Sequence, residues 1–155
     1  MFEGRLAAIY TTSEAGAPME ARPEIEAIVD VGLTGDRYAA GEGKHSAKPG
    51  SGRQVTLVER ETIAAVRAEG VELADHETRR NLLTEGVPLN HLVGQTFRVG
   101  DVVLRGVRLA EPCSYLAGLT HAGVSRALVH RGGLRADVVE GGMLRVGDRI
   151  SPQPL

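Results

Sequence analysis

Two runs of apolar and β-branched residues flank a glycine–aspartate pair in the stretch Thr96-Phe-Arg-Val-Gly-Asp-Val-Val-Leu-Arg-Gly-Val-Arg-Leu109. Valine, phenylalanine and threonine favour extended backbone, and a two-residue connection containing glycine joins antiparallel strands tightly. The stretch therefore predicts a hairpin with strands over residues 96–99 and 102–109 and a turn at Gly100-Asp101.

Similar short extended segments occur on both sides of this hairpin. We expect further strands over residues 5–10, 24–31, 54–58, 81–84, 134–139 and 144–150, and a turn over residues 15–23. The glycines Gly141, Gly142 and Gly147 are expected at turns near the end of the chain. Strands thus outnumber helices and follow one another at short spacing.

The clearest helix is expected from about Glu59 to Glu69, with acidic residues in its first turn and Gly70 after its end. Thr56 and Glu59 also fit a capping box, which would start the helix earlier, but we favour a strand up to Val58. Shorter helical segments are expected over 88–93, 114–119 and 124–129. These elements predict a mainly β protein with short helices, built as a mixed or antiparallel β-barrel.

The bulk composition limits the possible functions. The chain has 155 residues, which is the size of one domain, so we expect a single domain over 1–155. Its net charge of -2 argues against a nucleic-acid or membrane-surface partner, which would require a basic face. Residues 1–10 lack the apolar run of a signal peptide, and no segment has membrane-spanning length. We therefore expect a cytoplasmic protein.

Several standard motifs are excluded by their spacing. The run Gly41-Glu-Gly-Lys-His-Ser46 lacks the earlier glycine and the Ser or Thr that a phosphate-binding P-loop needs. The five histidines show no His-x-x-x-His spacing of a zinc protease. The single cysteine, Cys113, can form neither an intrachain disulfide nor a cysteine-rich zinc site. Any functional site of this chain must therefore use a less common combination of residues.

A group of arginines is the first candidate site. Arg79, Arg80 and Asn81 lie where a strand begins, and Arg53 precedes an earlier strand. Guanidinium groups form paired hydrogen bonds with phosphate oxygens, and an adjacent asparagine adds a donor and an acceptor. The alternative is a solvated basic pair beside acidic neighbours. Both interpretations stay open at the level of local sequence.

Cys113 and Asp36 are the other candidates. Cys113 follows Pro112 at the start of an expected helix, where the helix dipole would stabilise a thiolate; the alternative is a buried cysteine that only packs. Asp36 belongs to the turn Gly32-Leu-Thr-Gly-Asp-Arg37, which either is structural or lets a ligand approach the backbone closely.

The order of these motifs resembles the MOSC domain, named for the C-terminal part of molybdenum cofactor sulfurases. The resemblance covers about Gly4 to Ile150. It rests on the segments 32–37, Arg53-x-Val-x-Leu57 with Glu61 in the following helix, Arg79 to Gly86, Leu92-Val-Gly94, Val99-Gly-Asp101, Pro112-Cys113, Arg131 to Arg135 and Gly147-Asp148. Each motif alone has low specificity, whereas their joint order is specific.

The resemblance implies a mixed β-barrel of the MOSC type that binds a molybdenum–pterin cofactor. In MOSC-like reductases of N-hydroxylated compounds, the residue matching Cys113 is a molybdenum ligand; in sulfurase-type members it was proposed to carry sulfur as a persulfide. The cofactor would lie near Arg80 and Asn81, with its phosphate meeting Arg80, Arg79 or Arg53. Asp36 completes this predicted cofactor site.

The resemblance also sets expectations about partners. A reductase needs an electron-donor protein, and a sulfur carrier needs a cysteine desulfurase. No pyridoxal phosphate is expected on this chain, because no lysine can be nominated for a Schiff base. Many relatives have histidine after the Gly-Asp-Arg turn, where this chain has Tyr38, so a proton-donor role does not carry over to that position. The loop from Tyr38 to Gly52 is expected to border the site.

Overall fold

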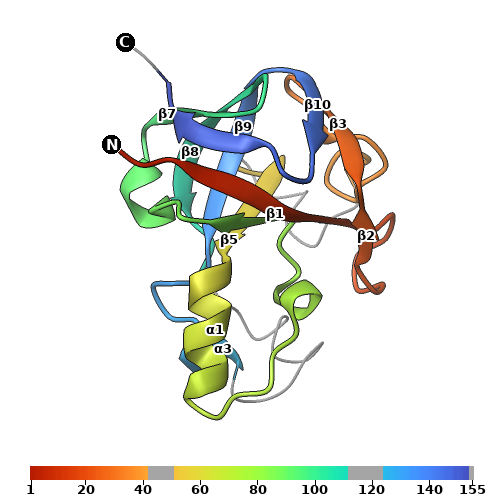
Figure 1. The fold of residues 1–155 in the computed structure, drawn as a ribbon. Coiled ribbons are helices and arrows are strands. Elements are labelled where there is room, and N and C mark those ends of the chain that lie inside the picture. The colour runs from red at the N-terminus through yellow and green to blue at the C-terminus, as the bar shows by residue number, and fades with distance from the viewer. Residues whose placement is uncertain (42–50, 112–123, 154–155) are drawn as a thin grey trace.

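The computed structural model describes residues 1–41, 51–111 and 124–153 (Figure 1). The strands are β1 Gly4–Thr11, β2 Glu20–Arg22, β3 Glu24–Ile28, β4 Gly32–Leu33, β5 Val55–Glu59, β6 Leu82–Glu85, β7 Thr96–Val99, β8 Val102–Leu109, β9 Leu134–Glu140, β10 Gly142–Arg145 and β11 Arg149–Pro152. The helical elements are α1 Arg60–Ala68, α3 Val124–Ala127 and the 3₁₀ turns η1 Asp75–Thr78 and η2 Leu89–Leu92.

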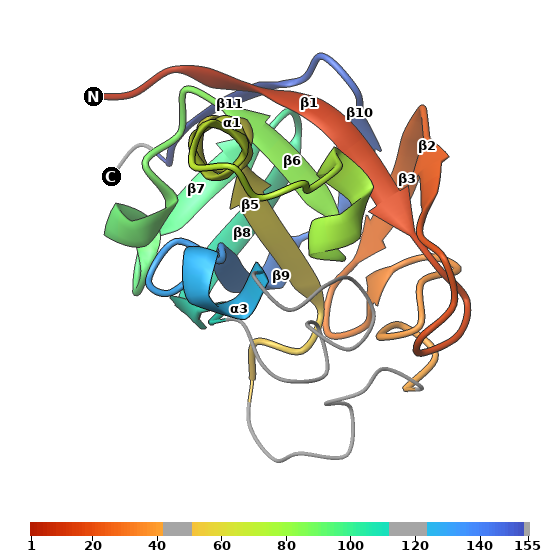
Figure 2. The same ribbon diagram turned by 90° about the horizontal axis from the view of Figure 1, so that it is seen from below.

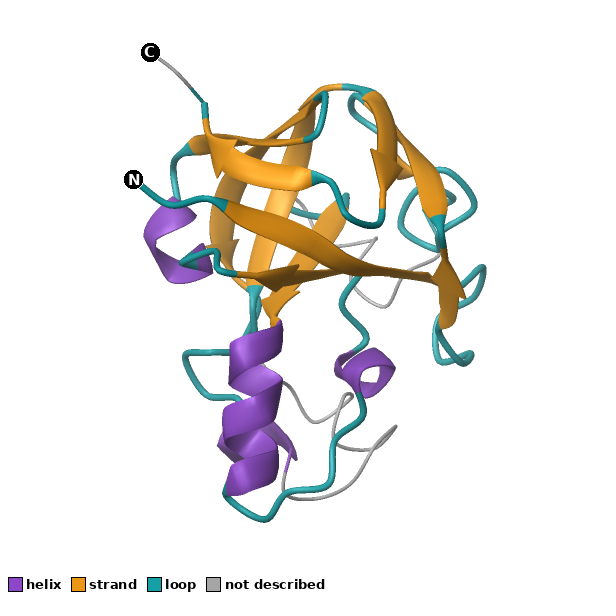
Figure 3. Cartoon of the chain, in the orientation of Figure 1, coloured by secondary structure: helices purple, strands orange, loops and turns teal. Residues whose placement is uncertain are grey.

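Seven strands close into a barrel in the order β11-β7-β8-β9-β5-β6-β1, and pairing of β1 with β11 completes the ring (Figure 3). The strand β2 extends the sheet beyond β1. Within the described sheets, β5 and β6 pair in parallel and the other strand pairs are antiparallel. The predicted mixed β-barrel with short helices is therefore confirmed.

Aliphatic side chains fill the barrel, as strand alternation requires. On β5, Val55 and Leu57 belong to the main core, whereas Val58 points outward and packs with Ile63 of α1. Burying a leucine or isoleucine side chain of this kind contributes about 1.5–3 kcal/mol. The separate sheet β10-β3-β4 joins the same core through buried side chains, namely Ala27, Leu33 and Leu144.

The helix α1 continues directly from β5 and lies beneath the barrel together with α3 (Figures 1 and 2). Its Val66 packs against Leu73 and Leu128, so α1 is joined to the segment that follows α3. The helix ends before Gly70, whose φ of 91° suits glycine. Thr56 lies inside β5, which confirms the strand interpretation over an earlier helix start. Among the described helices, none has the length and apolar character needed to cross a membrane.

The predicted hairpin over 96–109 and the strand starting near Leu134 are confirmed. The turn expected over 15–23 was wrong in part, because this segment contains the short strand β2. The turn expected at Gly147 is confirmed, with a φ of 98°. It divides the segment 144–150 between β10, which pairs with β3, and β11, which pairs with β7 and β1 of the barrel. The helix predicted over 114–119 lies outside the described residues.

Candidate functional site

A row of polar side chains crosses the outer face of the barrel from β5 to β8. Thr56 of β5 pairs with Arg135 of β9, and Arg135 pairs with Arg108 of β8. Residues paired in this way share one face of a sheet. Because the next pair along, Leu57 and Leu134, belongs to the barrel core, the row Thr56–Arg135–Arg108 faces outward.

Asn81 ties the start of β6 to this row. Its Oδ1 accepts hydrogen bonds from the backbone N–H of Thr56 at 3.1 Å and from the Thr56 hydroxyl at 3.2 Å. Its Nδ2 donates to the carbonyl of Tyr10 at 3.1 Å. Asn81 is fully buried, so these bonds replace water as partners of the amide. The side chain predicted to contact a cofactor thus joins β1, β5 and β6.

The two arginines before Asn81 reach distant backbone segments. Arg80 donates from Nε to the carbonyl of Gly132 at 2.8 Å and from Nη2 to the carbonyl of Ala110 at 2.7 Å. Arg79 donates from Nη1 to the carbonyl of Ala17 at 2.7 Å. Arg80 therefore links the start of β6 with the end of β8 and the start of β9.

Arg53 and Arg108 retain buried donors. The Nε of Arg53 and the Nη2 of Arg108 are buried and have no hydrogen-bond partner among the described residues. Arg108 donates from Nη1 to the carbonyl of Ser51 at 2.8 Å. Burial lowers the pKa of Arg53, and the positive charge of Arg108 lowers it further, while Tyr38 acts in the opposite direction. The positive charge of Arg108 therefore disfavours the charged form of Arg53.

Asp36 is fully buried and organises the turn in which it lies. Its carboxylate accepts hydrogen bonds from the backbone N–H groups of Thr12 and Tyr38, both at 3.2 Å, and from Arg37 Nη1 at 3.1 Å. The guanidinium of Arg37 lies over the ring of Tyr38, 4.8 Å from its centroid, and also donates to the carbonyl of Arg79 at 3.4 Å. Asp36 thus supports the site through Arg37 and Tyr38, and direct contact with a cofactor stays a prediction.

Cys113 itself lies outside the described residues, as does most of the loop that was expected to border the site. The described chain leads up to it at Glu111, which is fixed to His130. One carboxylate oxygen of Glu111 accepts from the backbone N–H of His130 at 2.7 Å, and the other lies 2.8 Å from His130 Nδ1. Together with the bond from Arg80 to Ala110, this contact anchors the chain immediately before Pro112-Cys113.

Arg108 lies against the backbone at Ser51 and Gly52, immediately before Arg53, and hydrogen bonds join Arg80 and Asn81 to neighbouring strands. Sequence reasoning missed Arg108. Inward-facing residues of β8 include Val102 and Leu104, so simple alternation would turn residue 108 inward as well. A register shift between Gly106 and Arg108 instead pairs Arg108 with outward-facing Arg135. Alternation alone gives no signal for this bulge.

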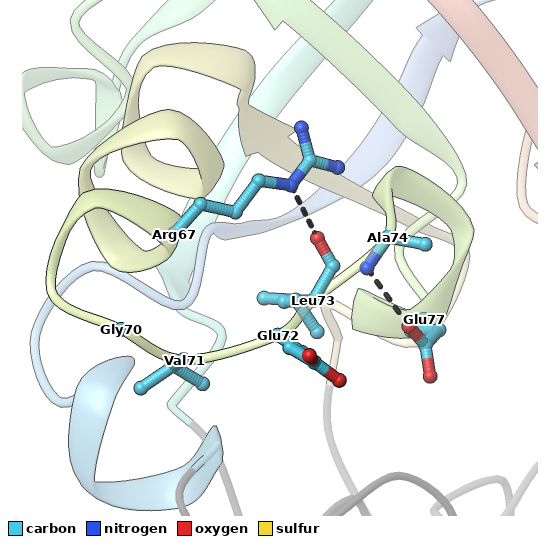
Figure 4. Close-up of a pocket in the computed structure, with 7 residues that line it drawn as sticks. All are labelled: Arg67, Gly70, Val71, Glu72, Leu73, Ala74 and Glu77. Atoms are coloured by element: carbon cyan, nitrogen blue, oxygen red, sulfur yellow. Dashed lines mark hydrogen bonds between the residues drawn. The ribbon is translucent and has the colours of Figure 1, made fainter.

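A hollow of about 560 Å³ lies elsewhere, between the end of α1 and η1 (Figure 4). Its shape is held by a hydrogen bond from Arg67 Nε to the Leu73 carbonyl at 2.6 Å and one from the Ala74 N–H to Glu77 at 2.8 Å. None of the predicted site residues lines it. Within the described ranges, no group of three or more His, Cys, Asp or Glu side chains is placed to hold a metal ion.

Comparisons with known structures support the fold. The YUAD protein from Bacillus subtilis is similar with a TM-score of 0.81 at 16% identity, covering 99% of this chain and 100% of that chain. YiiM from Escherichia coli gives a TM-score of 0.65 at 17% identity, covering 97% and 70%. YiiM from Geobacillus stearothermophilus gives 0.68 at 11% identity, covering 97% and 75%.

No curated protein matches the sequence. The family model described as MOSC domain matches residues 42–151, which is well over half of the chain. The matched range contains the outward-facing row Thr56–Arg135–Arg108, together with Asn81 and Cys113. The chain therefore belongs to the MOSC domain family.

Proposed function

We propose that this MOSC domain binds a molybdenum–pterin cofactor and reduces N-hydroxylated compounds, with Cys113 as the molybdenum ligand. The observation that carries the proposal is the pair of buried donors without described partners, Arg53 Nε and Arg108 Nη2, within a MOSC domain. A phosphate-bearing anionic cofactor fits such donors, because guanidinium groups bind phosphate oxygens through charge-assisted hydrogen bonds.

Each site residue has a distinct part in this proposal. Arg53 would hold the cofactor's phosphate, and Arg80, Arg79 and Asn81 would hold the strand ends that frame it. Cys113 would supply a thiolate, a soft ligand suited to the metal. Asp36 would keep Arg37 and Tyr38 in position beside Arg53.

The cofactor, when bound, would supply the redox chemistry, since no side chain of this set transfers electrons. The residues of the chain would bind and orient it. Electrons would come from an electron-donor protein that binds this domain.

The alternative is a sulfur-carrier module that holds a persulfide on Cys113 and receives sulfur from a cysteine desulfurase. The chain contains a single cysteine, so every persulfide it carries must form on that residue. This role requires the thiol but no bound metal. The two functions therefore differ in what the purified protein contains.

Metal and pterin analysis of protein purified from a host that makes the cofactor tests the reductase proposal. Wild-type protein is expected to contain molybdenum and pterin in stoichiometric amounts, and Cys113→Ser is expected to lose the molybdenum. Metal-free wild-type protein from such a host would contradict the proposal. Intact-mass analysis after incubation with a cysteine desulfurase and cysteine tests the alternative, which requires the addition of sulfur to wild-type protein and none to Cys113→Ser.

A further inference from the structure

We propose that Arg53 and Arg108 together form a binding site for a phosphate-like oxyanion on the outer face of the barrel, beside the start of β5. Arg108 is a new member of the site. The contacts of the two arginines support this site directly, and only the identification of the oxyanion as the phosphate of the cofactor rests on the proposed function.

The backbone just before β5 brings residue 53 next to the guanidinium of Arg108. Arg108 Nη1 donates to the Ser51 carbonyl at 2.8 Å, and the N–H of Gly52 donates to Asp137 Oδ1 at 2.8 Å. Gly52 has a φ of 81°, and a Cβ at this position would lie 3.0 Å from Arg108 Nη1. The chain therefore passes directly against the Arg108 guanidinium before it reaches Arg53.

The local charge is not balanced by the described carboxylate on this face. Asp137 of β9 accepts from the Gly52 N–H and from Arg105 Nη2 at 3.4 Å, so its two oxygens are already engaged. The guanidinium groups of Arg53 and Arg108 each have a buried donor without a described partner, which is costly, and an anion that accepts from both donors would remove this cost.

The hydrogen-bond donors favour Arg53 and Arg108, rather than Arg79 and Arg80, as the residues that bind the oxyanion. Arg80 uses Nε and Nη2 on two backbone carbonyls, and Arg79 uses Nη1 on a third. These arginines position the surrounding strands. Arg53, in contrast, donates no side-chain hydrogen bond to any described residue, which leaves its guanidinium for a ligand.

The charge of the pair indicates the class of ligand. A phosphate monoester carries a charge of about −1.5 to −2 near neutral pH and three acceptor oxygens. It can therefore neutralise two guanidinium groups and accept from both at once. Inorganic phosphate shares this chemistry and is a suitable probe.

Thermal unfolding of the full chain, purified without cofactor, tests the site. Inorganic phosphate is expected to raise the Tm of wild-type protein in a saturable way, above sodium chloride at equal ionic strength. Arg53→Met and Arg108→Gln are expected to lose this rise. Arg149→Gln, which removes an exposed arginine paired with Glu3 on another part of the barrel, is the matched control and should respond like wild type.

A second readout separates the site from a merely structural role. In phosphate-free buffer Arg53→Met should have a higher Tm than wild type, because the variant removes a buried Nε donor without a described partner and a positive charge near Arg108, and it removes no hydrogen bond to a described residue. A wild-type Tm that is equal in phosphate and chloride, or variants that respond to phosphate like wild type, would overturn the proposal.

The source of the oxyanion is distinguished by pterin analysis of the same variants made in a cofactor-producing host. Loss of both the phosphate response and the pterin identifies the ligand as the cofactor's phosphate. Loss of the phosphate response with full pterin content supports a separate site for a free oxyanion. Wild-type protein without pterin would contradict the proposed function, while the phosphate response would still decide the oxyanion site.

Discussion

Thr56 and Asn81 bind each other through backbone and side chain at once: Asn81 Oδ1 accepts from the N–H and hydroxyl of Thr56, and the Thr56 hydroxyl accepts from the N–H of Asn81 at 3.0 Å. These bonds join β5 to β6, the parallel pair of the described barrel. Thr56 is one end of the outward-facing row Thr56–Arg135–Arg108. Its contact with Asn81 therefore couples the stability of the barrel to the geometry of the candidate site.

Replacing Asn81 with alanine should therefore destabilise the protein strongly. The variant leaves the buried N–H of Thr56 and the carbonyl of Tyr10 without this side-chain partner, and we expect a loss of about 3 kcal/mol in the free energy of unfolding. Urea unfolding measures it. Asn90→Ala, which removes an exposed hydrogen bond to the His130 carbonyl, is the control and should cost less than about 1 kcal/mol. Equal losses in both variants would contradict this account.

Arg80→Lys should show whether Arg80 holds the neighbouring backbone segments in position or binds the oxyanion itself. Lysine keeps the charge but lacks the planar fork that reaches the Gly132 and Ala110 carbonyls together, so the free energy of unfolding should fall by about 2 kcal/mol. Inorganic phosphate should still raise the Tm of this variant. Arg126→Lys, at an exposed position of α3, serves as the control. Unchanged stability with a lost phosphate response would instead show that Arg80 contacts the anion.

Gly106→Ala should disturb the bulge that turns Arg108 outward. A Cβ on Gly106 would lie within 2.1 Å of the Leu92 carbonyl oxygen, so β8 or η2 must shift. We expect a loss of about 2 kcal/mol in stability, measured by urea unfolding, and a weaker phosphate response. The neighbouring exposed variant Arg105→Ala should cost less than about 1 kcal/mol. A Gly106→Ala protein with wild-type stability would contradict the close approach.

The raised pKa of Glu59 leads us to expect that the free energy of unfolding depends on pH in a specific way. Burial raises its pKa above 4.5, an effect that the hydrogen bond from the Leu89 N–H opposes. A carboxyl whose pKa is raised in the folded state contributes stability below its unfolded pKa, and this contribution is lost as the pH rises through the folded pKa. Glu59→Gln should therefore be more stable than wild type at pH 7, and the gain should disappear below pH 4.5.

Urea unfolding of wild type and Glu59→Gln across this range checks the expectation. Glutamine can still accept the hydrogen bond from Leu89, so the comparison isolates the charge. Glu24→Gln, an exposed position of β3, is the matched control and should show no comparable trend. A gain that grows as the pH falls would have the wrong sign for a buried carboxylate.

The sequence predicts an element well when the residues that shape it and the strand that pairs with it lie close together in the chain. The hairpin over 96–109 has a glycine turn between two apolar runs, and its register joins Val99 to Val102 as expected. The segment over 144–150 has the same apolar character, but its turn sends the two halves into different sheets. A short apolar run cannot indicate which partner strand it will meet.

The positions of the candidate site residues are predictable to a similar degree, while their role in binding a cofactor stays a prediction. Motif order pointed to Arg53, Arg80 and Asn81, and all three lie around the start of β5 and β6. The division between arginines that hold backbone and arginines with unused donors depends on contacts between residues 30 or more positions apart, such as Arg80 with Ala110. Arg108 was missed for the same kind of reason, since a bulge sets its direction.

The pairing of β1 with β11 also bears on how the protein is made. The strand β11 lies between β1 and β7, so the ring cannot close until residues 149–152 have left the ribosome. Until then the unpaired edges of β1 and β7 are exposed to other chains. Ribosome-bound chains should therefore remain protease-sensitive until β11 is released, and the barrel should gain its resistance in a single step at that point.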